Sequence, residues 1–227
     1  MAQADPICPT NIHFCAMRVT RLETDGSLAA GPNNAYITGS PVMLGLNPNI
    51  VAGESKQVIS GCDCICTSYK GPDKLLRFDL DLELCALEPG LIEMLTGSPL
   101  VTDDSDTPVG IGNSWANQLD CAQPTQPPSA IEAWASTWID DAQAPAPYAF
   151  TRYVFPMTFW QLDAWQVQND FLVPKFKGWT RSNSVWPAAG GVYDDYPEGA
   201  ELGPLGGYFW DAELPAALCD YQTASSG

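Results

Sequence analysis

Cysteine side chains are the first candidates for chemistry, because three of the eight in this chain are closely spaced. Cys62, Cys64 and Cys66 alternate with single residues. In a strand their sulfur atoms would share one face at a spacing of about 6.5–7 Å. That spacing is too wide for one tetrahedral zinc ion, whose bonds to sulfur are about 2.3 Å long, and the C-x-x-C turn of zinc sites is missing. We therefore interpret the cysteines as small core residues and expect no metal site.

Two alternatives for the cysteines stay open. A metal site could take ligands from the N-terminal segment, where the candidates are Cys8, His13 and Cys15. A disulfide could form after release into an oxidising medium. Residues 1–14 have neither a basic region nor a continuous apolar region, so we expect no secretory signal and reduced thiols in a cytosolic setting.

Carboxylates are the second candidates for chemistry. They are closely spaced at four places, namely Asp79/Asp81/Glu83, Asp103/Asp104, Asp140/Asp141 and Asp194/Asp195. Acid–base catalysis needs two carboxyls in a cleft whose surroundings separate their pKa values, whereas acidic runs usually lie on solvated faces. The single histidine argues against catalytic triads, and no nucleophile elbow, P-loop or dinucleotide-binding motif occurs. We expect a protein that is not an enzyme and has no cofactor.

The overall charge limits the possible partners. The chain has 227 residues, with 10 Lys and Arg against 27 Asp and Glu, and a net charge of -17. A surface this acidic is unsuited to gripping nucleic acid or an anionic membrane. No apolar run approaches the roughly 18 residues that a membrane span requires.

The acidic residues at 79, 81 and 83 must be positioned by a strand. Apolar residues at 78, 80, 82 and 84 alternate with them within residues 75–86, which is typical of a half-buried strand. Residues 58–70 are predicted to form the partner strand, with Gly71-Pro72-Asp73 as the reversal. One helix is predicted at residues 88–95, because Pro89 suits its first position and Gly97 its end.

Other strands are predicted at 14–21, 35–46, 130–138, 149–159, 171–176 and 207–213. This pattern, punctuated by 19 glycines and 20 prolines, predicts a mainly β fold closed as a sandwich or a barrel. We interpret residues 1–227 as one domain with a long polar surface excursion at 102–128. Residues 1–10 and 214–227 are expected to be flexible arms.

Two surface features allow alternative functions. The like charges of Asp79, Asp81 and Glu83 need an open, wet face, which is either plain solvated surface or the wall of a channel that must not bind a polyanion. Aromatic residues concentrate after residue 130 and could form a sugar-binding platform. Strand cores and subunit interfaces also use aromatic residues heavily, so we favour one of those roles.

Residues 57–101 resemble a known family. The elements of the resemblance are a GC-x-x-x-C strand at 61–66, a K-x-x-D-K stretch at 70–74, the acidic alternating strand, and E-P-x-L-x-x-x-L-T-G at 88–97. Residues 15–38, 131–141 and 148–162 are similar to further strands of the same family. As a joint match, the chain resembles the major tail proteins, or tail tube proteins, of long-tailed siphophage-type bacteriophages, particularly those of actinobacteria.

The resemblance implies a structural protein. Family members are β-sandwiches or half-barrels with one flanking helix, whose inner sheet joins a hexameric β-barrel ring. The rings stack into a hollow tube through which double-stranded DNA passes without sticking. About 24 strands spaced roughly 4.8 Å apart give a barrel about 37 Å across, which is wide enough for a duplex. Implied partners are other copies of the chain, the tape measure protein and the tail terminator or distal tail proteins. The implied location is the phage tail of a virion assembled in the host cytoplasm.

The resemblance also suggests site residues. Asp79, Asp81 and Glu83 are the candidates for lining the lumen. The segment 47–60 corresponds to a loop that reaches the adjacent ring, with the candidate residues Asn47, Asn49, Glu54 and Lys56. Two alternatives remain: a distal-tail or tail-terminator ring protein of the same fold, and a carbohydrate-binding or adhesin β-sandwich module. Many family members have an added immunoglobulin-like domain, which we do not expect within these 227 residues.

Overall fold

A computed structural model of the chain describes residues 10–59, 65–103, 110–115, 126–139, 142–145, 148–164, 173–185, 203–215 and 219–224. Within these residues the fold is mainly β, with a single helix, α1 (Pro89–Thr96). The strands are β1 (Thr10–Arg21), β2 (Ala35–Thr38), β3 (Pro41–Val51), β4 (Ser55–Ile59), β5 (Ile65–Lys70), β6 (Lys74–Leu84), β7 (Leu100–Thr102), β8 (Gly110–Asn113), β9 (Ser129–Ile139), β10 (Ala142–Gln143), β11 (Phe150–Leu162), β12 (Lys175–Thr180), β13 (Gly207–Asp211) and β14 (Asp220–Gln222).

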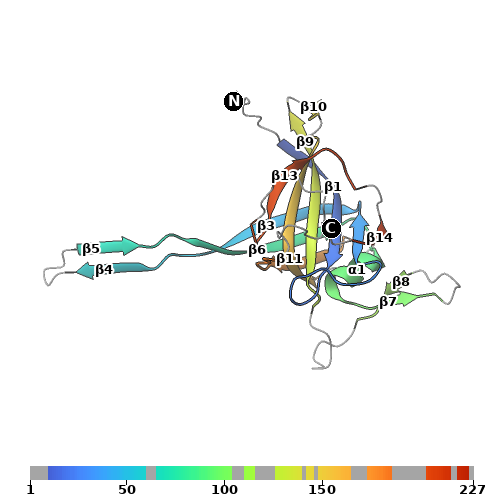
Figure 1. Cartoon of the computed structure of the whole chain (residues 1–227), viewed down its shortest axis with the longest axis horizontal. Coiled ribbons are helices and arrows are strands. Elements are labelled where there is room, and N and C mark those ends of the chain that lie inside the picture. Colours follow the sequence, from blue (N-terminus) through green and yellow to red (C-terminus); the bar gives the residue numbers. More distant parts are fainter. Residues whose placement is uncertain are drawn as a thin grey trace.

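The body of the molecule is one curled antiparallel sheet. Within the described residues ten strands belong to it, in the order β14-β2-β1-β9-β11-β12-β6-β3, with β10 beside β9 and β13 beside β11. The edge strand β3 contacts β1 near the opposite edge without pairing with it, so the sheet folds over on itself. Figure 1 shows β3 and β6 running across the direction of β1 and β9 and continuing outward as a long ribbon.

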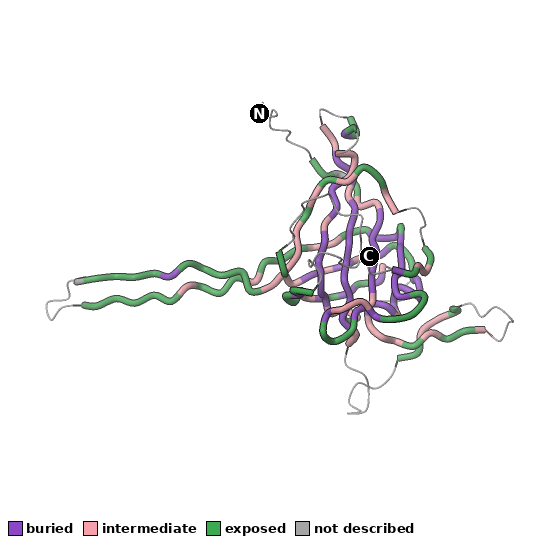
Figure 2. Tube along the Cα trace, viewed as in Figure 1, coloured by how far each residue is buried: buried purple, intermediate pink, exposed green. Residues whose placement is uncertain are grey.

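The core lies inside the curl, where α1 packs against the sheet. Leu80, Leu82 and Leu84 of β6 are at most 1% exposed, whereas the charged residues between them lie on the other face of the strand. The alternation predicted for this strand is therefore confirmed. From the helix, the buried side chains are Leu91, Ile92, Met94 and Leu95. This buried interior is the purple part of Figure 2.

The predicted helix is also confirmed, together with its ends. Pro89 is its first residue, where the missing N–H costs no hydrogen bond. Gly97 follows its last turn in the left-handed conformation (φ 72°) and donates its N–H to the Glu93 carbonyl at 2.8 Å. A side chain at Gly97 would be strained by that angle and would meet Pro127 at 2.9 Å.

The pairing predicted for the acidic strand is wrong. β6 pairs with β3 on one side and β12 on the other, and β5 pairs with β4 instead. The chain does not reverse at 71–73. These residues connect β5 to β6 along one side of a two-stranded ribbon, and the Gly71 N–H donates to the Glu54 carbonyl on the other side at 2.8 Å. Consequently residues 41–59 and 65–84 form the two sides of one long hairpin.

Other expectations changed in part. The strands β7 and β8 pair with each other in the region of the predicted excursion, of which residues 104–109 and 116–125 lie outside the described residues. The C-terminal segment, expected to be a flexible arm, includes β14, which pairs with β2. Burial raises the pKa of Tyr221, so its hydroxyl stays protonated and donates to Glu93 Oε2 at 2.9 Å. Residues 1–9 lie outside the described residues. In the part of the chain that is described, no helix has the length and apolar character to cross a membrane.

Candidate functional site

The acidic row, defined as Asp79, Asp81 and Glu83, lies on the polar face of β6 between two other strands. Asp79 is opposite Asn47 of β3 and Trp179 of β12, and Glu83 is opposite Met43 and Lys175. Strand β12 thus places basic residues beside the row, because Lys175 and Lys177 alternate along it as the carboxylates do along β6.

The carboxylates of the acidic row all have partners within the chain. Arg77 Nε lies 2.8 Å from Asp79 Oδ1, and Lys175 pairs with Glu83. The amide of Asn47 donates to Asp81 at 2.9 Å. The hydrogen bond that the Lys175 ammonium donates to Glu83, together with the charge of that carboxylate, raises the pKa of Lys175.

A fourth carboxylate, Asp163, pairs with Lys177 at 3.1 Å, and a hydrogen bond from the Ala164 N–H together with that lysine lowers its pKa. The face thus combines four acidic side chains with three basic ones, Arg77, Lys175 and Lys177, and retains one net negative charge. It is weakly acidic rather than strongly repulsive.

The four residues predicted to form an inter-ring loop are divided between two places. Asn47 and Asn49 are on β3 beside the acidic row, where Asn49 Nδ2 donates to Asp79 Oδ2 at 3.3 Å. Glu54 and Lys56 lie farther along the hairpin and form an ion pair of 2.9 Å with both side chains about 70% exposed. Residues 47–60 are mostly strand, not loop, because β3 continues to Val51 and β4 begins at Ser55.

The outer half of the long hairpin, residues 50–76, is the feature that sequence reasoning missed; we call it the arm. It extends away from the body in Figure 1, and almost all of its described length is green in Figure 2. Its large apolar side chains are 44% to 63% exposed: Ile50, Val51, Val58, Ile59, Ile65, Tyr69, Leu75 and Leu76. Proteins in water rarely leave so many large apolar side chains exposed along one extended segment without a binding partner.

The arm also differs in charge from the rest of the chain. It contains three lysines (Lys56, Lys70, Lys74) and three acids (Glu54, Asp63, Asp73), for a net charge of 3 − 3 = 0. The remaining residues contain 7 Lys and Arg and 24 Asp and Glu, for 7 − 24 = -17. The arm can therefore approach another copy of this acidic protein without like-charge repulsion.

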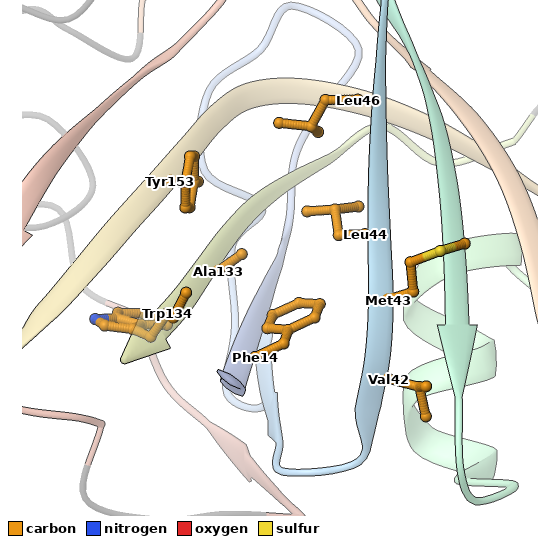
Figure 3. Close-up of a pocket in the computed structure, with 9 residues that line it drawn as sticks. Phe14, Val42, Met43, Leu44, Leu46, Ala133, Trp134 and Tyr153 are labelled. Carbon is orange, nitrogen blue, oxygen red and sulfur yellow. The ribbon is translucent and has the colours of Figure 1, made fainter. Parts of the chain in front are cut away.

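An apolar pocket of about 300 Å³ opens where β3 crosses β1, β9 and β11. It is lined by Phe14, Val42, Met43, Leu44, Leu46, Ala133, Trp134, Ala135 and Tyr153. Figure 3 shows Leu44 and Leu46 directed from β3 toward Phe14 and Tyr153. The two lining side chains with N–H or O–H groups already have partners: Asn11 Nδ2 donates to the Tyr153 hydroxyl at 2.6 Å, and Trp134 Nε1 donates to Asp211 at 3.2 Å.

Beside the pocket lies a buried ionic cluster that joins four strands. Glu132 of β9 is 0% exposed and pairs with both Arg18 of β1 and Arg152 of β11. Arg152 also reaches Asp211 of β13 at 3.4 Å. The Trp134 ring lies near both guanidinium groups, with its centre 4.9 Å from that of Arg152 and 5.5 Å from that of Arg18. The cluster ties together the strands that form one wall of the pocket.

The cysteines form no recognisable site in the described residues. Cys62 and Cys64 lie outside those residues, and Cys66 is on β5. Cys15, Cys85 and Cys219 are free thiols. Over the same residues, no three His, Cys, Asp or Glu side chains are grouped so that they could hold a metal ion.

The arm and the pocket are thus two apolar features of the described surface that a partner could cover. Comparison of the chain with models of protein families gives no match. A search of curated proteins gives no matching relative either.

Proposed function

We propose that this protein is the structural subunit of a bacteriophage tail tube, which assembles as hexameric rings that stack into a hollow conduit for DNA. The observation that carries the proposal is the arm, since its exposed apolar side chains need a partner. The mainly β fold with a flanking helix and the family resemblance of residues 57–101 support it. Under this proposal the protein is found in the phage tail, in contact with tape measure and tail terminator or distal tail proteins.

The physical case for self-assembly starts from the arm's marginal stability in isolation. An isolated two-stranded ribbon is barely stable in water, because too little apolar surface is buried to offset the loss of chain entropy. All five residues of β4 are exposed, as are Ile65 and Thr67–Lys70 of β5. Contact with a neighbouring subunit would bury these side chains and hold the ribbon straight.

The charge distribution fits the passage of DNA. With -17 on each chain, a ring of six would carry 6 × -17 = -102, so it would repel phosphate groups rather than bind them. The acidic row is the candidate lumen surface, although its neighbours Arg77, Lys175 and Lys177 lower the local charge. Most of the repulsion would then come from the summed charge of the ring rather than from that row alone.

A carbohydrate-binding module is the second candidate, and one observation favours it. Tyr208 and Trp210 on β13 are 69% and 39% exposed. Their rings contact Tyr153 and Tyr148, with centroids 5.9 Å and 5.2 Å apart. Exposed aromatic rings of this kind can stack on sugars. Such a module would be monomeric and would respond to added glycans.

Negative-stain electron microscopy over a range of protein concentrations tests these functions. Hollow filaments with a regular axial repeat are the expected result. Closed single rings that never stack would favour the distal-tail or terminator alternative. Monomers under every condition, with a shift in tryptophan fluorescence on glycan addition, would reject the tube in favour of the binding module.

A further inference from the structure

We infer that the apolar pocket binds the arm of a second copy of this chain. The part of the arm that enters it, called the arm tip, consists of Val58, Ile59 and Ile65. This assignment rests on the self-assembly proposed above and names the surface that would receive the arm. It joins two exposed apolar features of the described chain, the pocket and the arm, in a single contact.

The chemistry of the pocket favours an aliphatic occupant. Its mouth is apolar, since Met43 and Leu46 on its β3 side are 43% and 37% exposed. The N–H of Trp134 is already donated to Asp211, and the hydroxyl oxygen of Tyr153 already accepts a hydrogen bond from Asn11. A sugar or another polar ligand would therefore lose hydrogen bonds to water and find few replacements. A few aliphatic side chains, by contrast, would bury apolar surface on both sides.

The arm tip offers such side chains. Ile59 and Ile65 are paired across the ribbon next to its end, at 58% and 60% exposure, and Val58 beside them is 56% exposed. Among the described parts of the arm, β4 and β5 lie farthest from the body of the subunit in Figure 1. With a net charge of zero, the arm is suited to entering the surface of another acidic body.

A subunit cannot fill its own pocket with its own arm tip. Leu46 lines the pocket and Ile59 is thirteen positions farther along the same hairpin strand. At about 3.3 Å per residue in an extended strand, the tip lies about 40 Å beyond the pocket. The ribbon points away from the body in Figure 1, so the occupant must be a separate copy.

This contact joins two different surfaces and is therefore directional. Each copy donates one arm and offers one pocket, so one contact leaves a free arm at one end and a free pocket at the other. Heterologous contacts of this kind close into rings or extend without limit, whereas a self-complementary contact stops at two copies. The geometry thus supplies a reason for open-ended stacking.

Two variants with matched controls test the contact between the arm tip and the pocket. Leu46→Glu places a charge in the pocket and Val58→Glu places one on the arm tip. The same changes at exposed sites elsewhere, Leu87→Glu and Val101→Glu, serve as controls. Each test variant should raise the protein concentration needed for self-association at least about tenfold by sedimentation velocity, while the controls stay near wild type. Circular dichroism melting checks that each variant is folded.

Mixing the two test variants gives the sharper result. The intact arm of the Leu46→Glu protein can enter the intact pocket of the Val58→Glu protein, and the remaining ends are both blocked. We expect finite complexes containing both variants, detected with a tag on one of them, and no long filaments. If the mixture behaves like the separate variants, the arm does not use this pocket.

Photo-crosslinking keeps the test independent of the folding of Leu46→Glu. A photoreactive benzoyl-phenylalanine at position 59 of the otherwise wild-type chain should crosslink to peptides containing residues 42–46 or 133–135 of another copy. If the protein assembles but crosslinks only to other segments, the pocket is not the binding site of the arm, and the tube proposal is unaffected. Failure of the wild-type chain to self-associate under any condition would overturn both.

Discussion

At the scale of single residues, the buried Glu132 cluster is the strongest polar constraint on the body. Its carboxylate pairs with both Arg18 and Arg152, which are 8% and 1% exposed. Removing one member of a buried charge cluster leaves its partners desolvated without compensation, which costs much more than the cluster gains on formation. The cluster therefore specifies which strands lie side by side more than it adds net stability.

Glu132→Gln tests this role. The neutral amide has nearly the same shape but removes the carboxylate charge that the two buried guanidinium groups share. We expect the free energy of unfolding to fall by about 3–5 kcal/mol, measured by urea denaturation with circular dichroism. The exposed Glu23→Gln should change it by less than about 0.5 kcal/mol. An equal, small effect of both substitutions would show that the cluster contributes little.

At the scale of elements, the two strands of the arm approach each other closely at residues 53–54 and 71–73, which we call the joint of the arm. The Gly53 N–H donates to Asp73 Oδ1 at 2.9 Å, and the Gly71 N–H donates to the Glu54 carbonyl opposite it. A Cβ at Gly53 would lie 2.0 Å from the Gly71 carbonyl oxygen, far inside van der Waals contact. Any side chain at position 53 must therefore push the two strands of the ribbon apart.

Gly53→Ala is expected to weaken self-association through the arm without changing the stability of the body. The body melts as before because its core does not include this joint, but the misdirected arm weakens self-association by about tenfold or more. Differential scanning calorimetry and sedimentation velocity report the two properties. Gly112→Ala is the control, since nothing lies within 4 Å of a Cβ there. Unchanged assembly of Gly53→Ala would mean that the joint tolerates the displacement.

Local patterns predicted single elements well and their pairing poorly. The alternation of leucines with acids at 78–84 and the Pro89 and Gly97 signals of α1 are contained in a few neighbouring residues. The partners of the acidic row cannot be predicted from neighbouring residues, because Lys175 and Lys177 belong to a strand about ninety positions later in the chain. The family resemblance predicted a loop at 47–60, yet Pro48 lies in the edge strand β3, where its missing N–H costs no ladder bond.

At the scale of the whole molecule, charge and apolar surface oppose each other in assembly. Copies carrying -17 each repel, whereas the arm and pocket attract through apolar contact that salt does not screen. Added salt weakens the repulsion and leaves the attraction in place. The balance therefore shifts toward association as ionic strength rises, which is the reverse of the behaviour of a protein that binds DNA through basic side chains.

We therefore expect filaments to lengthen between about 0.05 M and 1 M NaCl, as the Debye length falls from more than 10 Å to about 3 Å. Light scattering follows the change, and electron microscopy confirms that the scattering particles are regular tubes. The same protein should not retard a double-stranded DNA fragment at low salt, where a phosphate-binding protein binds most tightly. Two results would contradict this prediction: dissociation of the assemblies by salt, or DNA binding that salt abolishes. Either would show that charge attraction, rather than apolar contact, dominates the interactions of this protein.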